Sequence, residues 1–198
     1  AVDKEIIFAL QKNNSNSVRV FALDLNESGE FQISNLKKQD GWINYIIGVF
    51  AEIEKKGVKI GGTDIVFAGD VPLGSGMSSS AALECALATG LNYLYEGNLS
   101  QIELALASQA AEHNFAGVKC GIMDQYASVF GKKNKVIKLD CRSLKHVYYD
   151  FDFEDYLILL CDTNVKHSLA SSEYNTRRNQ CEKGVEIIKQ RYPKVKNL

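Results

Sequence analysis

Hydrophobic and polar residues alternate along the first forty positions of the chain, which is the pattern of β-strands with one buried face. We expect strands at 5–10, 17–25 and 30–36. The Asn- and Ser-rich segment 13–16 is typical of a turn, because these short polar side chains hydrogen-bond to nearby backbone groups. The opening of the chain is therefore predicted to be a β-meander, and nothing in it indicates chemistry.

After residue 40 the hydrophobic residues recur at every third or fourth position, which predicts helices. Segment 42–56 carries one apolar stripe, which we interpret as core packing, and Ser100 with Glu103 forms a predicted capping box. The other expected elements are a strand at 64–68, helices at 81–95, 100–114 and 122–130, strands at 135–140, 146–151 and 156–162, and a polar helix at 171–192. Strands, then helices, then strands predict an α+β fold.

The composition is that of an ordinary globular protein, with 45% hydrophobic and 24% charged residues. A formal net charge of −1 gives no electrostatic reason to expect nucleic acid or a membrane surface as a partner. No apolar run approaches the roughly 20 residues of a membrane-spanning helix, and there is no basic leader. The five cysteines are scattered without a C-x-x-C pair, which favours reduced thiols over disulfides or zinc. We therefore expect a cytoplasmic protein.

Segment 71–83 carries the clearest chemical signal. Gly74 and Gly76 precede three consecutive serines, 78–80, and an apolar helical run follows. Glycines let the backbone approach a ligand closely, and serines can cap a helix whose first N–H groups then face an anion. The alternative is a capped helix after a strand, without a ligand. Two glycines and three serines exceed what a cap requires, so phosphate binding is favoured.

Three better-known glycine motifs do not fit this segment. A P-loop requires a lysine after its last glycine, and none follows Gly74. A dinucleotide-binding fingerprint requires a glycine where Ser79 stands, and a hydrolase elbow requires one where Ser80 stands. These mismatches exclude the three motifs and leave a different phosphate-binding turn.

Two carboxylates farther along could act together with a bound phosphate. Glu112 taken alone is interpreted as a solvated charge, but Mg²⁺ at the serines would require an oxygen ligand nearby. Asp124 begins a predicted helix, where it either complements the helix dipole or serves as a general base toward a hydroxyl. Spacing alone does not separate these two roles. His113 is expected to pack or cap rather than to catalyse.

A dense polar cluster at 171–178 begins the last predicted helix. A solvated helix start is the simplest interpretation. Tyr174 could instead present its hydroxyl to a polar ligand. Arg177 and Arg178 could bind phosphate or structural carboxylates.

Three motifs, in order along the chain, together resemble a known family. Residues 72–81, PLGSGMSSSA, resemble the phosphate-binding motif of the GHMP small-molecule kinases. Residues 111–117 (AEHNFAG) with 120–125 (CGIMDQ), and residues 164–178 (NVKHSLASSEYNTRR), resemble segments of galactokinases in particular. Coincidence is implausible for three motifs in the same order.

The resemblance implies an α+β fold, the N-terminal lobe of GHMP kinases, with a mixed sheet packed against helices as in domain 2 of ribosomal protein S5. It implies ATP-dependent phosphorylation of the anomeric hydroxyl of galactose, with Mg²⁺. The implied ATP-binding residues are Gly74, Ser75, Gly76, Met77, Ser78, Ser79 and Ser80. Ser80 and Glu112 are the implied metal ligands, and Asp124 is the implied catalytic carboxylate. Gly121, Asp124 and Tyr174 are the implied sugar contacts.

The resemblance also divides the chain into two expected domains. Residues 1–165 would be a GHMP N-terminal, ATP-binding domain without its first segment, and 166–198 the start of the C-terminal domain. Galactokinases carry an upstream arginine and a Glu-His-x-Asp segment that have no counterpart here, so we expect the 198 residues alone to have little or no activity. Two alternatives stay open: a non-catalytic galactose- and ATP-binding regulator of the same fold, and an N-acetylgalactosamine kinase.

Overall fold

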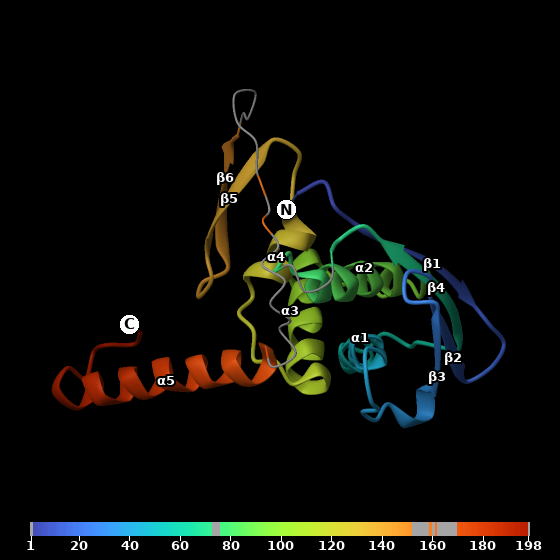
Figure 1. Cartoon of the computed structure of the whole chain (residues 1–198), viewed down its shortest axis with the longest axis horizontal. Coiled ribbons are helices and arrows are strands. Elements are labelled where there is room, and N and C mark those ends of the chain that lie inside the picture. The colour runs from blue at the N-terminus through green and yellow to red at the C-terminus, as the bar shows by residue number, and fades with distance from the viewer. Residues whose placement is uncertain (1, 73–75, 152–158, 160, 162–169, 198) are drawn as a thin grey trace.

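The structure is a computed structural model that describes residues 2–72, 76–151, 159, 161 and 170–197 (Figure 1). The first half contains β1 (Ile6–Lys12), β2 (Ser17–Ala22), β3 (Glu27–Gln32), the 3-10 turn η1 (Ile33–Asn35), α1 (Ile43–Lys55) and β4 (Thr63–Gly69). The second half contains α2 (Ser79–Leu94), α3 (Gln101–Ala111), the π-helical turn η2 (Glu112–Ala116), α4 (Met123–Phe130), β5 (Lys135–Asp140), β6 (Lys145–Asp150) and α5 (Ala170–Arg191). This order confirms the predicted succession of strands and helices. The strand expected at 156–162 falls mostly outside the described residues.

Strands β1 to β4 form one mixed sheet in the order β1-β4-β2-β3. β4 pairs antiparallel with β1, with Ile6 opposite Gly69, and parallel with β2, with Val18 opposite Thr63. The predicted β-meander is therefore wrong, because β4 inserts between the first two strands. Parallel neighbours cannot be joined by a tight turn, and α1 lies in the long connection between β2 and β4. The third strand also ends earlier than expected, at Gln32, where η1 begins.

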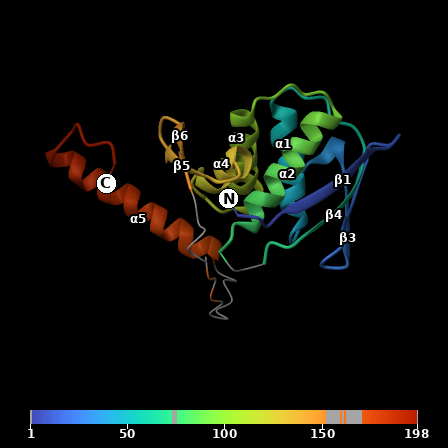
Figure 2. The same ribbon diagram turned by 90° about the horizontal axis from the view of Figure 1, so that it is seen from above.

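Helices α1 and α2 cover one face of this sheet, as the two views of the ribbon show (Figures 1 and 2). The alternation along β2 places Val18 and Val20 in the core, at 0% and 2% exposure. The stripe predicted on α1 is confirmed, because Ile46, Phe50 and Ile53 are fully buried. Each buried side chain of this size contributes roughly 1.5–3 kcal/mol. Together they hold the helical layer against the sheet.

A smaller cluster joins the β5–β6 hairpin to α3 and α4. Its buried members are Ala105, Ile122 and Tyr126. The Tyr126 ring stacks on Phe130 with centroids 4.2 Å apart, and its hydroxyl lies 2.6 Å from His146 Nδ1 on β6. Aromatic pairs at this distance add to the stabilisation from burial alone. The hairpin therefore fixes α4, the helix that carries Asp124, against α3.

Helix α5 extends beyond the rest of the fold toward the C-terminus (Figure 1). Its bounds agree with the polar helix predicted at 171–192. Its first turns reach the loop before α4, as described below. None of the helices in the described part of the chain combines the length and the apolar character needed to cross a membrane.

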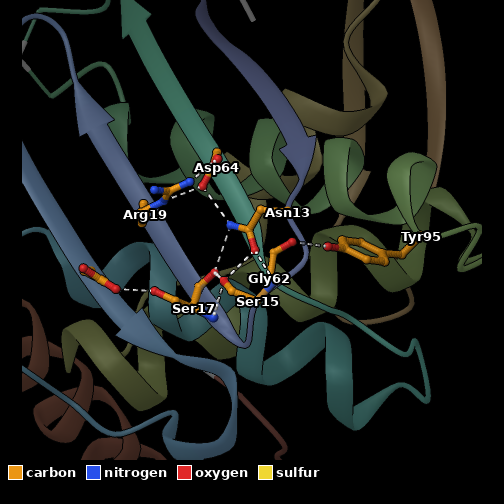
Figure 3. A network of polar contacts seen from close by, with 8 residues as sticks. Asn13, Ser15, Ser17, Arg19, Gly62, Asp64 and Tyr95 are labelled. Carbon is orange, nitrogen blue, oxygen red and sulfur yellow. Dashed lines mark hydrogen bonds and ion pairs between the residues drawn. The ribbon is translucent and has the colours of Figure 1, made fainter.

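The turn between β1 and β2 is tied to β4 by a polar network (Figure 3). Asn13 Nδ2 donates to Asp64 Oδ1 over 2.7 Å, and Arg19 donates to both oxygens of Asp64 over 2.8 and 2.6 Å. The hydrogen bonds from Arg19, and then from Asn13, lower the pKa of Asp64. Behind the turn, the carbonyl of Gly62 accepts from Asn13 N over 2.9 Å and from the Tyr95 hydroxyl over 3.1 Å. The network holds the inserted strand in register.

Candidate active site

The glycine- and serine-rich segment connects β4 to α2, between the sheet and the start of a buried helix. Gly74 and Ser75 lie outside the described residues. Gly76 has φ +76° and Ser78 has φ +59°, both in the left-handed region. Glycine adopts this region freely, whereas a serine there is uncommon and costs on the order of 1 kcal/mol. Strained backbone of this kind clusters at ligand-binding sites.

The prediction that a serine side chain caps α2 is wrong for the described residues. A capping side chain requires extended backbone at the N-cap position, so that its oxygen reaches the N–H groups of the first turn. Ser78 occupies that position with left-handed backbone, φ +59° and ψ +45°, and makes no such hydrogen bond. The N–H groups at the start of α2 are therefore not occupied by the Ser78 hydroxyl. Free N–H groups at a helix start favour an anion.

Glu112 lies where α3 gives way to the π-helical turn η2. Its side chain is buried, with 6% of the residue exposed, so a solvated charge is excluded. Oε1 accepts from Ser80 Oγ over 3.0 Å, and Oε2 accepts from Gln125 Nε2 over 2.7 Å. The structure thus brings together the two residues implied as metal ligands. Turns with π-helical hydrogen bonding occur frequently at functional sites.

A second carboxylate, that of Glu84 on α2, is buried in the same region. Glu84 is 0% exposed, and burial raises its pKa well above the ordinary range. The charge of Glu112 acts in the same direction. Burial disfavours the ionised form of a carboxyl group, and a nearby negative charge disfavours it further. The interior behind the serines therefore accommodates one carboxylate charge more readily than two.

The loop at 117–121 is held by the first turns of α5. Gly121 N donates to the Tyr174 hydroxyl over 3.2 Å, so the structure brings these two implied sugar contacts together. Asn175 donates to the carbonyl of Gly117 and accepts from Lys119 N, each over 2.9 Å. These bonds position the backbone that leads into α4.

Arg177 and Arg178, near the start of α5, make contacts within the protein. Arg178 Nη1 donates to the carbonyl of Lys119 over 3.0 Å, and its Nε donates to Glu182 over 3.0 Å. Arg177 lies 3.9 Å from Glu173, one helical turn away. The structure therefore supports the prediction of structural carboxylate partners, and Arg178 in addition binds the loop backbone.

Asp124 is in the first turn of α4, as predicted, and is partly buried. It lines a groove of about 830 Å³ together with Met77 and Ser78. The start of α2 and the candidate catalytic carboxylate therefore face the same space. His113 Nε2 donates to the carbonyl of Cys120 over 2.8 Å, which agrees with a packing role.

The sequence did not identify Gln125 or Asn175 as site residues. Gln125 follows Asp124 directly and is 0% exposed, and a polar residue on the buried side of a short helix is the signal that could have indicated it. Asn175 has no comparable signal, because its partners lie 56 to 58 residues earlier. Within the described part of the chain, no three His, Cys, Asp or Glu side chains form a metal-binding group. The candidate metal site is therefore one carboxylate and one hydroxyl.

Comparisons with known proteins bear on this arrangement. Residues 44–132 match the model of the GHMP kinases N terminal domain. Among curated proteins, the galactokinase of Thermosipho africanus is 44% identical over 188 residues, which is 95% of this chain and 52% of that protein. The galactokinase of Roseiflexus is 38% identical over 100% of this chain and 51% of its own length. The chain thus spans about half the length of the curated relatives it matches.

Solved structures give the same result for the fold. The galactokinase of Lactococcus lactis complexed with galactose superposes with a TM-score of 0.89 at 30% identity, covering 96% of this chain and 50% of that one. The mevalonate kinase of Methanococcus jannaschii, at 18% identity and a TM-score of 0.56, shares the fold over 63% of this chain and 42% of its own. The mixed sheet, the serine-rich start of α2 and the Ser80–Glu112 pair are thus found in a chain that matches the GHMP kinases N terminal domain over residues 44–132 and is similar to galactokinases over nearly all of its own 198 residues.

Proposed function

We propose that the protein is a galactokinase, which transfers the terminal phosphoryl group of ATP to the anomeric hydroxyl of galactose. The relatives at 38–44% identity carry this name, and the structural neighbour at TM-score 0.89 is complexed with galactose. Because the chain spans about half of each relative, the activity is proposed for the full-length protein. Phosphoryl transfer depends mainly on positioning and charge neutralisation.

The phosphates of ATP would bind at the start of α2. Left-handed backbone at Gly76 and Ser78 turns the chain so that the helix begins without a serine cap. Its first N–H groups, with the positive end of the helix dipole, suit the negative charge of a phosphate. Gly74, Ser75, Met77 and Ser79 complete the proposed loop by resemblance. The site therefore binds phosphate mainly through backbone donors.

Ser80 and Glu112 would hold Mg²⁺. Their oxygens lie 3.0 Å apart, and Glu112 is buried, so its carboxylate is held in a fixed direction. Mg²⁺ takes oxygen ligands and is usually bound by one or two carboxylates together with substrate phosphates and waters. One carboxylate and one hydroxyl beside a phosphate site fit that description. The ion would neutralise charge on the transferred phosphoryl group.

Asp124 would act on the acceptor hydroxyl. It lines the same groove as Ser78, which precedes the first turn of α2. There its carboxylate can accept the proton of the anomeric hydroxyl as the oxygen attacks phosphorus. Gly121 and Tyr174, joined by a 3.2 Å hydrogen bond, would contact the sugar beside it. The meeting of Ser78 and Asp124 in one groove is the observation that carries the proposal.

Two further proposals concern the context of this activity. The compartment would be the cytoplasm, which is consistent with five free cysteines, because reducing compartments keep thiols unpaired. The domain boundary would lie near 165, shortly before α5 begins at Ala170. Limited proteolysis of the full-length protein would locate it.

Galactose-dependent release of ADP by the full-length protein tests the proposal. Asp124→Asn should lower kcat by about 10²–10⁴-fold, the usual contribution of a general base, and leave the KM for ATP within about twofold. Asp140→Asn, on the hairpin, is the matched control and should keep the wild-type rate. Binding of galactose and ATP without turnover would instead show a regulator, and faster turnover of N-acetylgalactosamine would show the other kinase. An unchanged kcat for Asp124→Asn would remove this residue from the mechanism.

A further inference from the structure

Gln125 lies between the two halves of the proposed site. Its side chain is 0% exposed and its Nε2 donates to Glu112 Oε2 over 2.7 Å. Its neighbour along α4 is Asp124. We propose that Gln125 is a positioning residue, which orients the Glu112 carboxylate for the metal ion and fixes its place relative to Asp124. The proposal rests on the proposed function, because it concerns the same metal.

The Glu112 carboxylate is held at both oxygens. Ser80 Oγ donates to Oε1 over 3.0 Å, and Gln125 Nε2 donates to Oε2 over 2.7 Å. An ionised carboxylate offers about four lone-pair positions, so these bonds leave positions for a cation. When Ser80 turns to bind the ion as well, the bond from Gln125 keeps the carboxylate from rotating. Groups that hydrogen-bond to a metal-ligating carboxylate act in this way.

An amide is the side chain that suits this place. Glu84 and Glu112 are both buried here, at 0% and 6% exposure, so a further charge would be costly. The Gln125 amide donates a hydrogen bond and adds no charge. Without it, the only other donor to Oε2 among the described residues is the Cys120 thiol at 3.4 Å, a weak donor. Neither a carboxyl nor an apolar side chain would reproduce the amide.

Gln125 also connects several secondary-structure elements. Its own carbonyl accepts from Cys85 Sγ on α2 over 3.6 Å, while its side chain reaches η2. Three elements that carry proposed site residues, namely α2, η2 and α4, therefore meet at this one residue. A displacement of Glu112 is transmitted to the first turn of α4, where Asp124 is located.

The test compares Gln125→Met with the wild-type full-length protein. Methionine matches glutamine in length and volume and removes the donor. Mn²⁺ affinity in the presence of a non-hydrolysable ATP analogue, measured by electron paramagnetic resonance, should weaken by about 10–100-fold, the usual effect of losing such a partner. The Mg²⁺ concentration that gives half-maximal rate should rise in parallel, while the KM for galactose stays within about twofold.

Two companion variants complete the experiment. Gln101→Leu is the control, because Gln101 also donates to α4, at the carbonyl of Val129 over 3.3 Å, and contacts no carboxylate of the site; it should leave Mn²⁺ affinity unchanged. If Gln125→Met does not fold, Gln125→Asn takes its place, because it fits the same space but withdraws the amide by one methylene. Wild-type Mn²⁺ affinity in the folded variant overturns the proposal. Absence of galactose phosphorylation by the wild type overturns the proposed function instead.

Discussion

Gly62 leaves no room for a side chain, because a Cβ placed there would lie 2.1 Å from both Asn13 Oδ1 and the carbonyl oxygen of Ser15. The second of these atoms belongs to the backbone of the β1–β2 turn, so the overlap cannot be relieved by a rotamer change. Gly62→Ala should therefore push the turn away from β4 (Figure 3). The hydrogen bond from Asn13 N to the Gly62 carbonyl, 2.9 Å long, would be strained or lost.

The expected cost follows from these contacts. Forcing an extra carbon into a packed site costs about 1–3 kcal/mol, and a lost hydrogen bond adds about 1 kcal/mol. We expect Gly62→Ala to destabilise the protein by about 3 kcal/mol, and Tm to fall by up to about 6 °C, because the shift per kcal/mol shrinks as chain length grows and the relatives are about twice as long as this chain. Circular dichroism of the full-length protein during heating, with urea unfolding as a second measure, gives both quantities.

Gly61→Ala is the matched control at the neighbouring position. A Cβ there would approach the Tyr95 ring and hydroxyl no closer than 3.7 Å, an ordinary van der Waals contact. This variant should unfold at the wild-type temperature or slightly above it, since the reduced entropy of the unfolded chain stabilises the protein by about 0.4–1 kcal/mol. Equal Tm values for the two variants would refute the steric argument.

Two further predictions concern titratable groups. The pKa of Asp64 is lowered by Arg19 and Asn13, so its stabilisation is present above the unfolded-chain value of about 3.9 and is lost as pH falls through the folded value. Asp64→Asn should therefore lower Tm at pH 7, with a difference that shrinks as pH falls below about 3.9; a difference that stays constant as the pH is lowered into this range would contradict the prediction. Burial raises the pKa of Cys120 to about 12, so iodoacetamide at pH 8 should alkylate the exposed Cys141 much faster. Equal rates of alkylation at Cys120 and Cys141, measured by mass spectrometry, would contradict the burial of the Cys120 thiol.

Local patterns predicted the elements of the fold well. The alternation in segment 17–25 predicted a strand with one buried face, and Val18 and Val20 are buried on that face, because strand geometry sends every second side chain to the same side. The Ser100–Glu103 capping box is present, with Ser100 N donating to Glu103 over 2.9 Å. Both features depend on residues close together in the chain, and such features can be inferred from sequence.

The features that were mispredicted depend on distant residues. The position of β4 between β1 and β2 is set by packing of α1 and α2, which alternation within a strand does not reveal. Ser78 fails as a cap because its backbone is left-handed, a conformation that a run of serines does not indicate. Glu112 is buried because α2 and α4 close over it, with partners 32 and 13 residues away. The sequence motifs indicated Ser78 and Glu112 as candidate site residues, but their arrangement depends on the fold.

The insertion of β4 has a consequence for how the protein folds as it is synthesised. β2 and β3 are joined by a short turn and can pair early, on the microsecond scale of hairpins. Among the described residues β1 pairs with β4 alone, with Ile6 opposite Gly69, and this pairing must wait until α1 and β4 have left the ribosome. Closing so long a loop before this pairing is gained slows folding. The arrival of β4 should therefore be the slow step in forming the sheet, and until then the edge of β1 that β4 will occupy is open to chaperones or to other chains.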